Sequence, residues 1–66
     1  MSGAIPQAGE TLDVVVTREL PFGVLVETGA GVAGLVRGAR GSAGATLRVR
    51  VVESDAALGR FSAEPG

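Results

Sequence analysis

The sequence predicts an all-β fold in the form of one small barrel, and three observations lead to this prediction. Short stretches in which apolar and polar residues alternate recur along the chain, with glycine-containing stretches between them. No stretch has the apolar spacing of a helix of ordinary length. The chain has 66 residues, which suffice for one hydrophobic core and not for two.

Three candidate strands lie in the first part of the chain, over residues 12–17, 22–27 and 32–37. In the first of them Val14 and Val16 share one face, because side chains alternate along a strand. Residues 18–21 connect the first two strands, and Pro21 among them cannot donate a hydrogen bond to a sheet. A turn at residues 28–31, where glycine allows positive φ, precedes the third strand.

Two more candidate strands follow a flexible, glycine-rich loop at residues 38–44. The fourth expected strand covers residues 46–53, where apolar residues alternate with Arg48 and Arg50 as in a half-buried strand. The last turn and the closing strand are expected at residues 54–59 and 60–63.

Five strands in so short a chain are the number found in an OB-type barrel, and an SH3-like barrel is the alternative. The barrel is expected to span residues 9–63. Residues 1–8 and 64–66 are expected to be frayed ends, because chain termini are ordered only where something holds them.

Residue composition argues against an enzyme. The chain has no histidine, cysteine, tyrosine or lysine, so the usual general bases, thiol nucleophiles and Schiff-base formers are absent. Its carboxylates are scattered, without the spacing of a metal site or of paired acids. No glycine cluster is followed by the lysine of a phosphate-binding loop. We therefore expect no cofactor, no metal and no catalysis.

Charge and hydropathy set further expectations. The net charge is −1, which argues against strong, indiscriminate attraction to nucleic acid. All six cations are arginines, which suits phosphate pairing and base stacking, or equally the codon usage of a GC-rich bacterial genome. The sequence has no apolar run long enough for a membrane and no signal pattern. A soluble, cytoplasmic, monomeric protein is the expectation.

The order of several short motifs resembles the S1 RNA-binding domain. Gly9-Glu10 precedes the first valine-rich strand, and Pro21-Phe22-Gly23 opens the second. Gly31-Val32-Ala33-Gly34-Leu35-Val36 is similar to the family's Gly-x-x-Gly-Leu-Val strand, and the fourth strand begins after Gly44. Asp55, followed by Gly59-Arg60, is similar to the family's closing turn. The resemblance covers residues 9–62, nearly the whole chain.

The resemblance implies a site for single-stranded RNA on one face of the barrel. Carried over by position, this site consists of Phe22, Leu25, Arg37, Asp55 and Arg60. Leu25 stands where the family usually has a second aromatic residue, and Arg37 stands where it often has histidine. The connection at residues 38–44 is shorter than the family's partly helical one.

The residues themselves leave alternatives open. Phe22 is a stacking platform if a bend turns it outward, which we expect from the resemblance, or a core residue if strict alternation holds. Phe61 is expected in the core. Asp55 either forms an ion pair with Arg60 or serves in the turn.

Arg37, Arg48, Arg50 and Arg60 form a basic strip if strand pairing brings them to one face. For Arg48 and Arg50 we expect ordinary solvated positions instead. Arg37 and Arg60 are the better candidates for RNA contact, since the resemblance places both on the ligand side.

The function that follows is weak, salt-sensitive binding of single-stranded RNA with little sequence preference, in translation, RNA decay or transcription. The partner would be RNA, with the ribosome or another protein as further candidates. The alternative is a protein-docking barrel that has lost most of its RNA site, because Leu25 leaves an apolar residue on that face.

Overall fold

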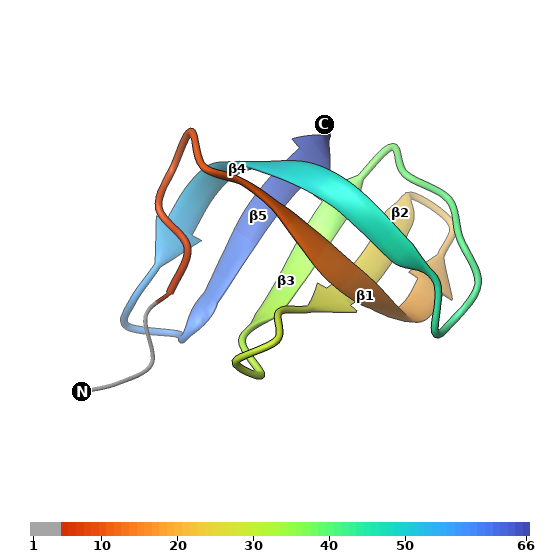
Figure 1. Ribbon diagram of the computed structural model, residues 1–66, viewed down its shortest axis with the longest axis horizontal. Helices are drawn as coiled ribbons and strands as arrows, with labels where there is room; N and C mark the ends of the chain where they lie inside the picture. Colours follow the sequence, from red (N-terminus) through yellow and green to blue (C-terminus); the bar gives the residue numbers. More distant parts are fainter. Residues whose placement is uncertain (1–4) are drawn as a thin grey trace.

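The computed structural model describes residues 5–66, which form a closed barrel of five strands (Figure 1). The strands are β1 (Thr11–Leu20), β2 (Gly23–Glu27), β3 (Ala33–Arg37), β4 (Thr46–Asp55) and β5 (Arg60–Pro65). Neighbours around the barrel follow the order β1-β2-β3-β5-β4, and β4 closes on β1. All pairs are antiparallel except β3 and β5, which run parallel. The predicted five-stranded OB-type barrel is confirmed.

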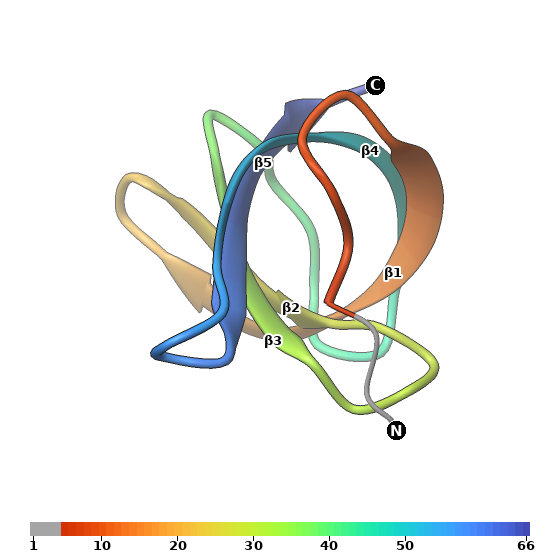
Figure 2. The same cartoon turned by 90° about the vertical axis from the view of Figure 1, so that its left-hand side faces the viewer.

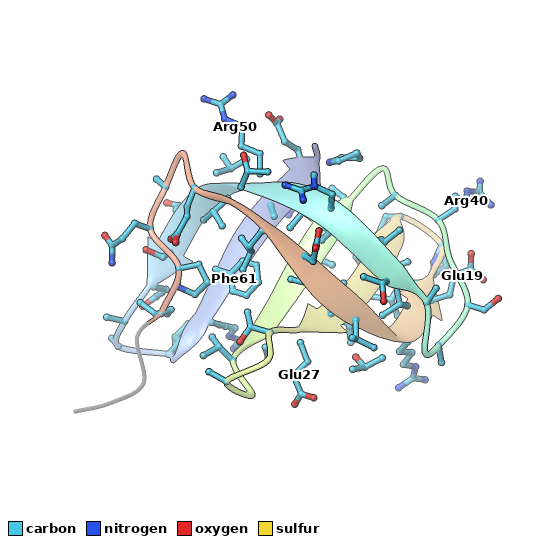
Figure 3. All side chains as sticks on the ribbon, in the orientation of Figure 1. Glu19, Glu27, Arg40, Arg50 and Phe61 are labelled. Carbon is cyan, nitrogen blue, oxygen red and sulfur yellow. The ribbon has the colours of Figure 1, made fainter. Side chains whose placement is uncertain are left out.

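The core is made mostly of valine. Seven valines are less than 2% exposed, and Phe61 and Ala63 complete the buried set at 4% each. In β1, β2, β4 and β5 the residues of this set lie two positions apart, as alternation requires. Figure 3 shows the ring of Phe61 inside the barrel, while Glu27 and Arg50 project outward. The expectation that Phe61 belongs to the core is confirmed.

The barrel has two differently built sides. In Figure 1, β1 and β4 cross in front of β2, β3 and β5, so the outer face of the latter three strands looks away from the viewer. Figure 2 shows the turn between β1 and β2 projecting beyond the rest of the barrel. The pairing of β1 with β4 ends at Val15 and Thr46. The turn projects because β1 continues beyond this point, paired only with β2.

The strand boundaries differ from the sequence prediction most clearly around the β1–β2 turn and at the end of β4. Residues 18–20 were expected in a connection but belong to β1, because an irregularity in the strand lets the hairpin continue. Phe22 was expected in the second strand but lies with Pro21 in the hairpin turn. The fourth strand continues through Ser54 and Asp55, which pair with Phe61 and Arg60.

The chain ends are better ordered than the frayed termini that were expected. Glu64 and Pro65 pair with β4, and the backbone N–H of Gly66 donates to Arg48 O at 3.0 Å. Near the start, Gly9 N–H donates to Val51 O at 2.7 Å, and Pro6 is buried. Residues 1–4, which were also expected to be frayed, lie outside the described part. Across residues 5–66 there is no helix that could span a membrane.

Candidate nucleic-acid interface

A bulge in β1 decides which way Arg18 points. Val16 pairs with Val26, but the next pair joins Arg18 to Leu25, so Thr17 is the extra residue. Regular pairing would place Arg18 opposite the buried Val24, facing the core. The bulge instead turns Arg18 to the outer face, and the Thr17 hydroxyl donates to Leu25 O at 3.2 Å across it.

A second bulge has the same effect in β4. Val51 pairs with Ala63, and the next pair joins Glu53 to Ser62, so Val52 is the extra residue. Without this bulge Glu53 would lie opposite the buried Phe61. With it, Glu53 faces outward beside Ser62, and Val52 is 55% exposed.

The two bulges bring five outward residues into one row across the barrel. Successive cross-strand partners are Arg18 (β1), Leu25 (β2), Leu35 (β3), Ser62 (β5) and Glu53 (β4). We call this set the cross-strand row. At the usual separation of strands its length is about 19 Å. It begins with a cation, ends with an anion, and has two half-buried leucines between them.

Most of the cross-strand row lines an open groove of about 600 Å³ on the outer face of β2, β3 and β5. Leu25, Leu35, Ser62 and Glu53 contribute to it, and the β4–β5 turn adds Ala56 and Leu58. Leu58 is 63% exposed. The groove therefore has an apolar floor with charged side chains at its edge.

Of the predicted site residues, Leu25, Asp55 and Arg60 line this groove and Phe22 and Arg37 do not. Arg60 pairs with Ala33 at the start of β3, whereas Arg37 is the last residue of that strand. Four residues of extended chain separate the two positions, or about 13 Å. The predicted residues thus do not form one compact cluster.

Phe22 is exposed, which resolves the alternative left open by the sequence. Its side chain is 59% exposed, and its carbonyl oxygen accepts a hydrogen bond from Gly38 N–H at 3.1 Å. Its neighbour Gly23 pairs with Arg37, so Phe22 lies at the same end of β2 and β3 as that arginine. A Cβ on Gly23 would lie 2.9 Å from Arg37 Cα. Glycine is therefore needed where β2 and β3 approach each other beside the ring.

Asp55 serves in the turn rather than in an ion pair. Its Oδ1 accepts a hydrogen bond from Leu58 N–H at 3.1 Å, and its carbonyl accepts one from Gly59 N–H at 2.9 Å. It is the cross-strand partner of Arg60, but the ion pairs formed among residues 5–66 do not include this one. The structure therefore favours the second of the two roles considered for Asp55.

The basic strip of four arginines does not form. Arg48 lies 3.5 Å from Asp13 (Nε to Oδ1), and Arg50 lies 3.7 Å from Glu64 (Nη1 to Oε2). Both pairs are exposed, and each involves β4 rather than the groove. This agrees with the expectation that Arg48 and Arg50 occupy solvated positions.

Three residues of this face were not predicted from the sequence: Arg18, Leu35 and Glu53. Leu35 could have been found, because it alternates with the buried Val36 in the same way as Leu25 does with Val24 and Val26. Arg18 and Glu53 could not have been found, because strict alternation from the buried Val16 and Val51 would point both side chains into the core. No group of three or more metal-binding side chains occurs within residues 5–66.

The comparisons with known proteins add information about the fold. No protein-family model and no curated protein matches this chain. Among solved structures, it is similar to the uncharacterized protein MJ1198 from Methanocaldococcus jannaschii, with a TM-score of 0.83. The match covers 96% of each chain at 18% sequence identity. At this identity the similarity concerns the barrel and carries no function.

Proposed function

We propose that this chain is a non-catalytic, S1-like module that binds single-stranded RNA on the outer face of β2, β3 and β5. The observation that carries the proposal is the combination of an exposed Phe22 ring, at the Arg37 end of β2 and β3, with the cross-strand row on their outer face. Proteins that bind single strands combine a stacking ring with cations that follow the backbone. This face offers both.

The aromatic part of the site is small. Phe22 is the exposed ring, because Phe61 is buried and the chain has no tyrosine or tryptophan. One base stacked on it would contribute about 1–3 kcal/mol. The leucines of the row would add apolar contact to neighbouring bases without reading their identity. Binding is therefore weak and largely tolerant of sequence.

The cationic part consists of Arg18, Arg37 and Arg60, which are not engaged in the ion pairs formed within residues 5–66. Guanidinium groups suit phosphate oxygens because their N–H donors form a planar fork. Three contacts would make the affinity moderately dependent on salt, with a slope of about −0.7 per phosphate neutralised.

Protein docking is the second candidate, and the carboxylates of the face favour it. Glu27 of β2 and Glu53 and Asp55 of β4 are exposed, the latter two line the groove, and together they offset the arginines. An apolar groove with an exposed Leu58 and balanced charge also suits a partner protein. Such a partner would not require Phe22 to stack.

A titration of the ¹⁵N-labelled chain with a mixed-sequence single-stranded RNA heptamer at low salt tests the proposal. We expect shifts of the backbone amides of Phe22, Leu25, Leu35, Arg37 and Arg60. The amides of Asp13 and Arg48, on the side formed by β1 and β4, serve as internal controls and should not move. An absence of shifts at millimolar RNA would overturn RNA binding and favour docking of a protein in the groove.

A further inference from the structure

The two charged ends of the cross-strand row would form different hydrogen bonds with a nucleotide. Arg18 can only donate hydrogen bonds and Glu53 can only accept them, and the leucines lie between. The geometry points to a base-reading position, in which Glu53 selects bases that carry an exocyclic amino group over uracil. This inference rests on the proposed RNA binding and adds a preference at one nucleotide.

Glu53 is the carboxylate of the groove that is available for this role. Asp55 is engaged by Leu58 N–H at 3.1 Å, whereas Glu53 makes no side-chain hydrogen bond or ion pair with any other described residue. Its row neighbour Ser62 is half-buried and lines the same groove. Serine both donates and accepts, so it can complete the contact to a base edge.

The hydrogen-bonding pattern of the bases supplies the discrimination. Cytosine presents an amino donor at N4, which carboxylates accept, whereas uracil has a carbonyl oxygen at the same position. An oxygen of uracil facing the Glu53 carboxylate would meet a second acceptor, and no hydrogen bond would form. Adenine and guanine also carry amino donors. The groove therefore disfavours uracil at this one position.

The opposite end of the row orients the nucleotide. A phosphate is held by the Arg18 guanidinium and repelled by the Glu53 carboxylate, so the backbone lies toward β1 and the base edge toward β4 and β5. Leu25 and Leu35 lie between and contact the ring face. The β1 and β4 bulges thus decide the orientation jointly, because each turns one of the two charged residues outward.

The test compares RNA pentamers that differ at one position, with uridine or cytidine at the centre of an otherwise all-uridine chain. Dissociation constants are measured by NMR titration of the whole chain. Wild type should bind the cytidine pentamer about fivefold more tightly. E53Q should bind both equally, since an amide can donate to uracil as well as accept from cytosine.

E27Q is the matched control, because Glu27 is an exposed carboxylate on the same face but outside the cross-strand row. It removes the same charge and should keep the fivefold difference. Equal binding of both pentamers by wild type would overturn base reading and leave RNA binding intact. Loss of the difference in E27Q as well would assign it to overall charge. No binding of either pentamer would overturn both proposals.

Discussion

The ring of Phe61 lies against the Cα of Gly34, its partner in the parallel pair of β5 and β3. A Cβ added to Gly34 would lie 2.6 Å from Cε1 and Cε2 of that ring. The glycine of the Gly-Leu-Val stretch is therefore a packing requirement: it makes room for the largest side chain of the core. This contact is central to the stability of a barrel whose other core residues are mostly valine.

We predict that G34A destabilises the barrel by about 1–3 kcal/mol, because the added methyl group overpacks the core against Phe61. Urea unfolding measures the change. G29A is the control, because a Cβ on Gly29 meets no atom within 4 Å. It should be neutral or slightly stabilising. Equal stability of G34A and wild type would show that the ring moves aside without cost.

We predict that F22A lowers RNA affinity by about 1–3 kcal/mol while leaving the free energy of unfolding nearly unchanged. The ring is 59% exposed, so the core loses little when it is removed. V52A is the comparison, because Val52 is exposed to a similar degree at 55% but is not among the residues proposed to contact RNA. Equal RNA affinities of F22A and V52A would remove Phe22 from the site.

We predict that R18Q weakens RNA binding and reduces the salt slope by about 0.7, the value for one phosphate on a single strand. Titrations at several salt concentrations give the slope. R48Q removes the same charge from the opposite side of the barrel, where Arg48 lies 3.5 Å from Asp13. Its slope should stay close to that of wild type. A reduced slope in both variants would indicate nonspecific attraction.

We predict that T17V destabilises the β1–β2 hairpin by about 0.5–1 kcal/mol, because it removes the hydrogen bond from the Thr17 hydroxyl to Leu25 O. Because this bulge turns Arg18 outward, RNA affinity should fall as well. Urea unfolding and RNA titration of the same variant separate the two effects. T46V, at another exposed strand threonine, should change neither. Unchanged stability in T17V would mean that the bulge needs no side-chain support.

Alternation along the chain was sufficient to predict the barrel. Val14 and Val16, the valine-rich second strand, and Val49 and Val51 are buried as the period of two requires. Phe61 was assigned to the core from the resemblance to the S1 domain, which places an apolar residue inward at this position. These features depend on local sequence, because a strand with one apolar face can be buried in only one register.

The composition of the functional face depended on the tertiary structure. Nothing local in the sequence marks Thr17 or Val52 as the extra residue of a bulge, since a bulge is defined by the pairing of two strands. One extra residue reverses the direction of every side chain that follows it. Arg18 and Glu53 therefore face outward, although strict alternation would place them inward. The sequence by itself determined the barrel and its core. Only the strand pairing of the closed sheet placed Arg18 and Glu53 at the two ends of one row on its outer face.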